Sequence, residues 1–203
     1  MTISYPLNLP TSSGITEIII TQVSGTRTAR SSVTDKLYTQ RGDGGYWKAR
    51  VSLPYVFRDE GAEWIGFLAS LDGQYGSFYL GDSTATTPLG TALGTPLVKG
   101  ASQTGFSIIT DGWTINQTGC LKSGDYIQIG SYLYIITKDA DSDAGGNSTL
   151  DIWPRLRTSP ADNEGIITTN TKGIFRLTDS EISLFSADGD KVYSISFNAE
   201  EAI

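Results

Sequence analysis

Only one stretch of the chain has the residue spacing of an amphipathic helix, and this points to a mainly β fold. The stretch is RDEGAEWIGFLASLDG. Its large apolar residues, which recur at helical spacing, are Trp64, Phe67, Leu68 and Leu71. Asp59 and Glu60 complement the positive end of a helix dipole, and Gly73 stands where a C-terminal cap belongs. The pattern predicts a single helix over residues 59–72.

The other hydrophobic residues fall in short runs of β-branched and aromatic side chains, separated by polar or glycine-rich turns. In residues 46–53 the side chains alternate, so that Trp47, Ala49, Val51 and Leu53 share one face. The runs predict strands at 14–21, 33–38, 46–53, within 73–82, 106–110, 126–129, 132–137, 150–153, 166–169, 173–177 and 192–197.

The order of these runs predicts a discontinuous first domain with a second unit inserted into it. The composition changes at Asp82, and residues 83–105 are rich in Thr, Gly, Ala and Pro, as in a linker or arm. Residues 106–165 then read as a small antiparallel β-barrel. The last strands need partners, which we expect in the first segment, so residues 1–82 and 166–203 form a β-sandwich that carries the helix.

Several residue types and motifs that are common in catalytic and metal sites are missing. The 203 residues include no histidine, which removes the commonest general base and the usual zinc ligand. The single cysteine, Cys120, cannot form an internal disulfide, and no phosphate loop, dinucleotide fingerprint or nucleophile elbow is present. The net charge of −7 disfavours nonspecific binding to nucleic acid or anionic lipid, and no stretch is apolar enough to span a membrane. We expect no enzymatic activity and no cofactor.

The most suggestive polar stretch is DADSDAGGN, in which Asp139, Asp141 and Asp143 match the first three ligand positions of an EF-hand calcium loop. The rest of that pattern fails, because Ala144 stands where the loop needs glycine and Leu150 where it needs glutamate. The three aspartates are weak metal candidates. We interpret the stretch as a polar turn between two strands, with no obligatory metal.

Several segments together resemble the distal tail proteins of long-tailed siphophages. They are YPLNLP near the start, EWIGFLASLDGQYGSFYLGD, LKSGDYIQIG and FRL around the inserted unit, and YSISFNAEEAI at the end. The resemblance extends over nearly the whole chain as an overall pattern. It implies a belt domain, which is a β-sandwich with one helix, and an inserted barrel of OB-like or galectin-like type.

The resemblance also implies a structural role in a virion. Similar proteins are hexameric rings at the distal end of the tail. They join the tail tube protein to tape-measure, baseplate hub and fibre proteins, while DNA passes through the lumen without specific binding. We therefore expect a homohexameric hub made in the bacterial host cytoplasm, with no membrane insertion and no catalytic residues. Another minor tail protein is the nearest alternative.

A different alternative is a module that binds host-surface carbohydrate through the aromatic residues of the barrel. Trp113 and Trp153 are the candidate glycan contacts, and Tyr126, Tyr132 and Tyr134 lie on neighbouring predicted strands. Aromatic residues at alternate strand positions are more often part of a core than of a sugar platform.

Overall fold

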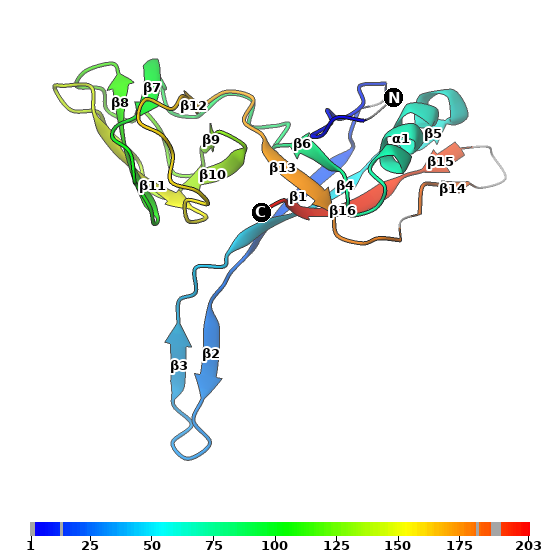
Figure 1. The fold of residues 1–203 in the computed structure, drawn as a ribbon, viewed down its shortest axis with the longest axis horizontal. Helices are drawn as coiled ribbons and strands as arrows, with labels where there is room; N and C mark the ends of the chain where they lie inside the picture. Colours follow the sequence, from blue (N-terminus) through cyan, green and yellow to red (C-terminus); the bar gives the residue numbers. More distant parts are fainter. Residues whose placement is uncertain (1–2, 13, 182, 188–191) are drawn as a thin grey trace.

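The chain forms two β-structured bodies, from which a long hairpin projects (Figure 1). The computed structural model describes residues 3–12, 14–181, 183–187 and 192–203. One body, here called the sandwich, contains a five-stranded sheet, a three-stranded sheet and the only helix of the described residues; the other is a six-stranded antiparallel barrel. The predicted fold class, mainly β with one helix and an inserted barrel, is confirmed.

The five-stranded sheet unites the two ends of the chain. Its order is β1 (Glu17–Val23), β4 (Tyr46–Ser52), β16 (Ser196–Glu201), β13 (Gly173–Leu177) and β6 (Ser77–Leu80), all antiparallel. The predicted pairing of the last strands with the first segment is confirmed, because Phe197 lies opposite Val51. The predicted apolar face of residues 46–53 is also confirmed, since its four side chains are buried.

Helix α1 (Arg58–Ser70) covers the apolar face of this sheet and confirms the predicted helix within two residues at either end. The Trp64 and Leu68 side chains of the helix are fully buried. Phe67, also in the helix, packs edge-on against Phe78 of β6 with ring centroids 5.5 Å apart. Gly73 has a φ of +63°, as a glycine beyond a helix C-terminus requires. The helix and the sheet therefore share one core.

A small three-stranded sheet lies at the N-terminal end of the helix. It consists of β14 (Ser186–Ala187), β15 (Val192–Ser194) and β5 (Val56–Phe57). The single strand predicted at 192–197 is wrong, because the chain leaves this sheet at Ile195 and enters the five-stranded sheet as β16. Ile195 is buried, and its carbonyl accepts the Leu53 N–H at 3.0 Å, so the two sheets meet at this point.

The barrel is nearly closed. Its strand order is β12 (Ile166–Ile167), β9 (Tyr126–Ile129), β10 (Tyr132–Ile136), β11 (Ser148–Trp153), β8 (Ser107–Trp113) and β7 (Gly94–Val98). Val98 N–H donates to the Glu164 carbonyl and Asn163 N–H donates to the Val98 carbonyl, both at 2.9 Å. These bonds join the segment before β12 to β7, so the sheet has no long free edge.

Two predicted boundaries of the barrel are wrong. Residues 83–105 are not a linker throughout, because β7 lies within them and pairs with β8. The strand predicted at 166–169 for the first domain is β12, which pairs with β9 of the barrel. Pro96 and the irregular register between Gly94 and Leu97 explain why β7 has no strand-like sequence pattern.

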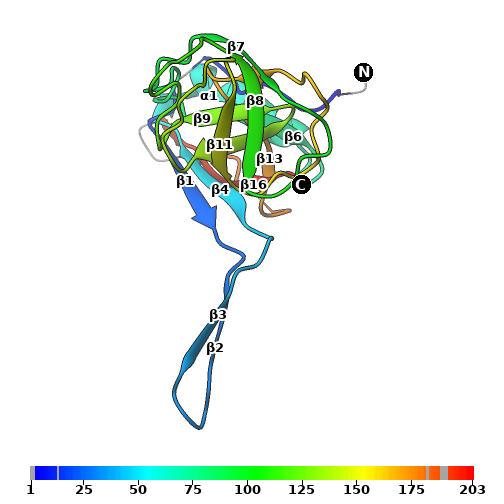
Figure 2. The same ribbon diagram turned by 90° about the vertical axis from the view of Figure 1, so that its left-hand side faces the viewer.

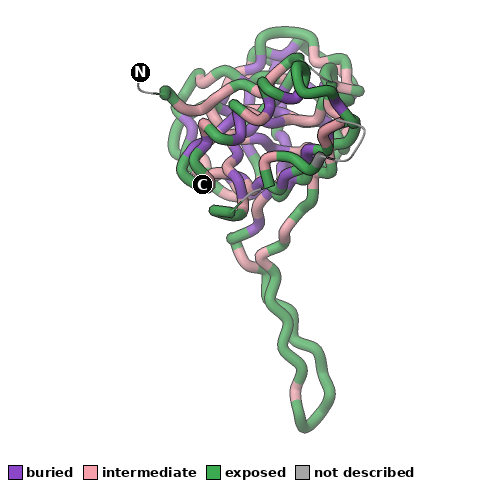
Figure 3. Tube along the Cα trace, turned by 90° about the vertical axis from the view of Figure 1, so that its right-hand side faces the viewer, coloured by how far each residue is buried: buried purple, intermediate pink, exposed green. Residues whose placement is uncertain are grey.

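The projecting hairpin, here called the arm, comprises residues 24–45. Its strands β2 (Arg27–Arg30) and β3 (Leu37–Gln40) pair only with each other, and all eight of their residues are exposed. Figures 2 and 3 show the arm extending away from both bodies, with exposed residues along nearly its whole length. The strand predicted at 33–38 is wrong, because Val33 and its neighbours form the tip and only the last two residues belong to β3.

Within the described residues, no helix is both long and apolar enough to cross a membrane.

Candidate assembly surfaces

The tip of the arm is an ordered turn. Ser31 N–H donates to the Lys36 carbonyl at 2.9 Å, and Asp35 N–H donates to the Ser31 carbonyl at 3.0 Å. The Ser31 hydroxyl accepts from the N–H groups of Val33 and Thr34. Asp35, which has a φ of +56°, pairs with Arg30 at 2.9 Å. These contacts fix the loop and leave the Val33 side chain pointing into solvent.

The base of the arm is clamped against the barrel. The Arg41 guanidinium lies 3.6 Å from the centroid of the Phe106 ring, and the Asp43 carboxylate pairs with Arg155. The two legs of the hairpin approach closely at Gly25 and Gly42, where a side-chain carbon on Gly42 would lie 2.3 Å from the Gly25 carbonyl oxygen. Residues 41–43 are therefore part of this clamp, at the base of the arm.

The arm carries apolar side chains that the chain itself does not cover. Val33 is 90% exposed, Leu37 54% and Tyr38 58%. An isolated two-stranded hairpin is only marginally stable in water, because it has no core of its own. The three exposed side chains are therefore available for contact with another molecule, and such a contact would supply the hairpin with the core that it lacks.

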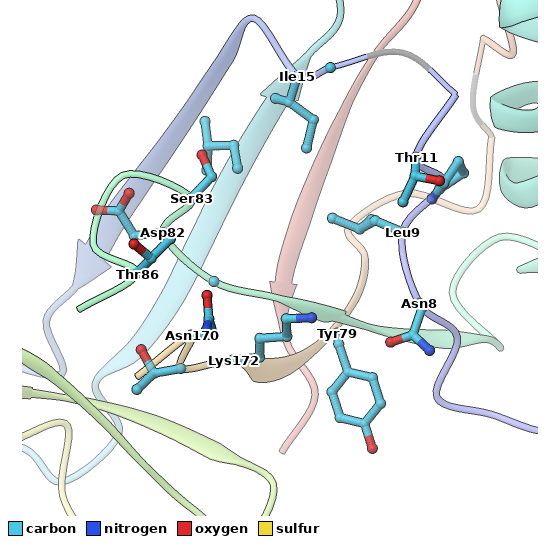
Figure 4. A pocket seen from close by; sticks show the side chains of 15 residues that line it. Asn8, Leu9, Thr11, Ile15, Tyr79, Asp82, Ser83, Thr86, Asn170 and Lys172 are labelled. Atoms are coloured by element: carbon cyan, nitrogen blue, oxygen red, sulfur yellow. The ribbon is translucent and has the colours of Figure 1, made fainter. Parts of the chain in front are cut away.

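A groove of about 580 Å³ opens at the edge of the sandwich. It lies between residues 8–11 and 14–15 near the N-terminus, the start of β1, the end of β6 with the loop after it, and residues 170–172. Figure 4 shows Leu9 and Ile15 reaching into this space, with Asp82 and Lys172 on its other side. Leu9, Ile15 and Ile18 are half-buried at the margin of the sandwich core and form the apolar part of the lining. The volume is within the range of about 300–1,000 Å³ that is common for ligand sites.

The sandwich and the barrel are joined by a buried polar contact that no sequence pattern predicts. Arg157 of the barrel and Glu201 of β16 form an ion pair in which Nε donates to Oε1 at 3.0 Å, and both side chains are less than a tenth exposed. The same carboxylate accepts the backbone N–H of Trp47 at 3.1 Å. Because each charged group has a partner, the pair can persist without water.

The indole of Trp47 makes a second connection between the two bodies. Its Nε1–H donates to the Leu133 carbonyl in the barrel at 2.9 Å. The ring packs edge-on against Trp153, with centroids 4.4 Å apart, and also contacts Tyr126. Trp47 belongs to β4 of the sandwich, and its side chain is nearly fully buried. The barrel is thus held in a fixed orientation on the sandwich.

The two tryptophans predicted as glycan contacts do not form a surface platform. Trp113 is buried in the barrel core, and its Nε1–H donates to the Thr110 hydroxyl at 2.8 Å. Trp153 is half-buried between Trp47 and Gly45, at the junction of the barrel with the sandwich. Burial leaves Trp113 no free ring face for a sugar, so the structure does not support its predicted glycan contact. The glycan contact of the half-buried Trp153 stays a prediction.

The three aspartates of the predicted polar turn bind groups of the protein itself. Asp139 pairs with Lys122 at 2.8 Å and accepts the Ser123 N–H, which together lower the pKa of its carboxyl. Asp141 accepts the Gly119 N–H, and Asp143 accepts the N–H groups of Gly145 and Asn147. The bonds from Asn147 lower the pKa of Asp143. No cluster of three possible metal ligands occurs in the part of the chain that the structure describes.

Tyr134 gives the barrel a measurable response to alkaline pH. Burial raises the pKa of this phenol to about 12, although the Arg157 N–H donates to its oxygen at 3.2 Å. In the unfolded chain the phenol ionises near its ordinary pKa of about 10. Its contribution to stability is therefore complete below pH 10 and is lost as the pH rises towards 12.

We expect the free energy of unfolding of the wild type to fall more steeply between pH 10 and 12 than that of Tyr134→Phe. Urea titrations at a series of pH values measure this difference, which should be on the order of 2–3 kcal/mol over the interval. Parallel pH profiles for the two proteins would contradict the assignment.

No protein-family model matches the sequence, and a search of curated proteins finds no match. A function for the chain therefore has to be inferred from its surfaces. The sequence predicted neither the arm nor the groove; of the two tryptophans that it singled out, Trp113 is buried and Trp153 is half-buried.

Proposed function

We propose that the protein is a structural subunit that assembles with copies of itself into a ring, as expected for the distal tail protein of a long-tailed phage. The observation that carries the proposal is the arm, which extends from the body and has exposed apolar residues at and near its tip. A surface of this kind on a clamped, protruding hairpin suits a contact with another subunit. The hexameric state, the virion location and the tail partners rest on the sequence resemblance.

The distribution of charge supports self-association through the arm. Residues 24–45 contain four basic and two acidic side chains, whereas the rest of the chain contains eleven basic and twenty acidic ones. A cationic arm is therefore attracted to the acidic body of another copy. Part of the arm's charge is already paired, in the contacts of Arg30 and Asp43, which leaves Arg27 and Lys36 to act at long range.

The rigid attachment of the arm also supports a ring. A closed ring needs every subunit to present its contact at the same angle. The clamp formed by Phe106 and Arg155 fixes the arm on the barrel, and the Trp47 and Glu201 contacts fix the barrel on the sandwich. Each copy therefore offers its arm in one direction.

Removal of the arm tests the proposal. Gly25 and Gly42 lie close together, so residues 26–41 can be replaced by two glycines without separating the legs. We expect the wild type to form ring-shaped hexamers in native mass spectrometry and electron microscopy. The armless variant should remain monomeric, with a circular dichroism spectrum that differs only by the loss of β2 and β3. Leu89→Asp is the control, because Leu89 is an exposed apolar residue outside the arm, 81% exposed against 90% for Val33, and its replacement should not affect assembly. A wild type that stays monomeric and never joins tail tubes would refute the proposal.

A further inference from the structure

The arm and the groove are complementary features of one molecule that lie apart from each other. In Figure 1 the tip of the arm and the N-terminal segment that borders the groove are at opposite ends of the view. The clamp at Arg41 and Asp43 holds the arm away from the body of its own chain. The arm therefore cannot fill the groove of the same copy without breaking these contacts.

We propose that the groove bordered by Leu9, Ile15 and Ile18 receives the tip of the arm from a second copy of this chain. This inference rests on the proposed function and adds to it the surface that the arm contacts on the neighbouring copy. The tip offers Val33 at its end and the nearby side chains of Leu37 and Tyr38, and the groove offers a half-buried apolar lining. Bringing the two together removes apolar surface from water on both sides.

Charge favours the arm of another copy over an acidic partner as the occupant. The arm has an excess of two positive charges, and Arg27 and Lys36 have no ion pair among the described residues. The groove has Asp82 on its side, and Glu17 lies at the start of the adjoining strand β1. Lys172 is the one basic residue of the lining. Asp82 and Lys172 offset each other, and Glu17 leaves the margin of the groove with one excess negative charge, which favours the cationic arm.

Strand β1 provides a further reason for this seat. It is the terminal strand of the five-stranded sheet, and within the described residues one of its edges has no partner strand. Backbone groups on such an edge pair readily with a strand from another chain. Ile15 lies just before β1, and Ile18 is the second residue of the strand. An arm in the groove therefore lies beside the free backbone groups of this edge.

The contact is of the kind that closes rings. Two different surfaces meet, the tip of one copy and the groove of the next, so each copy uses both surfaces and the contact repeats head to tail. A contact between two arms would instead be symmetric and would stop at a dimer. The two arrangements therefore differ in how single-surface variants behave.

Complementary variants separate the two arrangements. Val33→Asp disables the tip and leaves the groove intact, whereas Ile15→Asp disables the groove and leaves the tip intact. We expect each variant alone to be monomeric and their equimolar mixture to form one-to-one heterodimers in native mass spectrometry. In the mixture, the intact tip of Ile15→Asp can bind the intact groove of Val33→Asp. The heterodimer also shows that both variants are folded.

Disulfide formation gives an independent test. Cys120 is buried, so new cysteines are not confused with it. Oxidation of the double variant Val33→Cys/Ile15→Cys should give a ladder of covalent oligomers, while either single variant gives none. A ladder-free double variant, or dimers from Val33→Cys alone, would overturn the arm-in-groove contact.

The outcomes also distinguish this inference from the proposed function. If the wild type forms rings and Ile15→Asp forms them equally well, the arm does not bind in the groove, although the proposed ring assembly is still supported. If Ile15→Asp forms rings but loses binding to tail tube protein, the groove belongs to that partner and the inference is wrong. If the wild type never self-associates, both are wrong.

Discussion

Glu201→Ala should lower the free energy of unfolding by about 3–5 kcal/mol, because it leaves the Arg157 guanidinium buried without its partner. Both side chains of this ion pair are nearly inaccessible to water, and the lost carboxylate also accepts the Trp47 backbone N–H. Urea-induced unfolding followed by circular dichroism measures the change. Glu201 is the last residue of β16, the middle strand of the five-stranded sheet.

Glu200→Ala is the matched control. Glu200 is the neighbouring residue, and it pairs with Arg176 at 3.5 Å in a more exposed setting. Its loss should reduce stability by no more than about 1 kcal/mol. Replacing both buried partners, as in Arg157→Met/Glu201→Met, should restore most of the loss, because no charge is then left unpaired. An equal effect of the two single glutamate variants would show that burial of the pair is unimportant.

Trp47→Ala should also destabilise the protein by about 3–5 kcal/mol, through the cavity left by a buried indole. Because this indole contacts the barrel through Leu133, Tyr126 and Trp153, its loss should also loosen the barrel on the sandwich. Differential scanning calorimetry should then show two separate transitions where the wild type shows one.

A comparison of two tryptophans isolates the hydrogen bond of Trp47. The Trp64 indole is equally buried, but its Nε1–H has no acceptor among the described residues. Trp47→Phe abandons the Leu133 carbonyl, which costs about 1–3 kcal/mol beyond the loss of ring volume. Trp64→Phe removes an unsatisfied donor, so part of its loss is offset. The Trp47 variant should therefore be the less stable of the two.

The elements that were predicted correctly are those whose sequence pattern follows from burial. Helix α1 and strand β4 each have one face against a core, so their apolar residues recur with the helix or strand period. The hairpin turn of the barrel between β9 and β10 follows from Gly130, which has a φ of +56°. In these regions local sequence and tertiary structure impose the same pattern.

The elements that were missed have no such pattern. The strands of the arm, RTAR and LYTQ, have no buried face within the chain, so nothing makes their side chains alternate. Strand β7 is interrupted by a proline and an irregular register. The Arg157–Glu201 pair joins residues far apart in sequence, and the groove is assembled from four separate segments. Tertiary contacts alone create these features.

The barrel is inserted between two neighbouring strand ends of the sandwich, so another domain could replace it. Leu80, the last residue of β6, lies directly opposite Gly173, the first residue of β13. The chain thus leaves and re-enters the sandwich at adjacent points. The two segments are so close that a side-chain carbon added to Gly81 would lie 2.0 Å from the Thr171 carbonyl oxygen. A foreign domain grafted there would keep the five-stranded sheet intact. It would also have to provide an acceptor for the Trp47 indole, a cation for Glu201 and a brace for the arm.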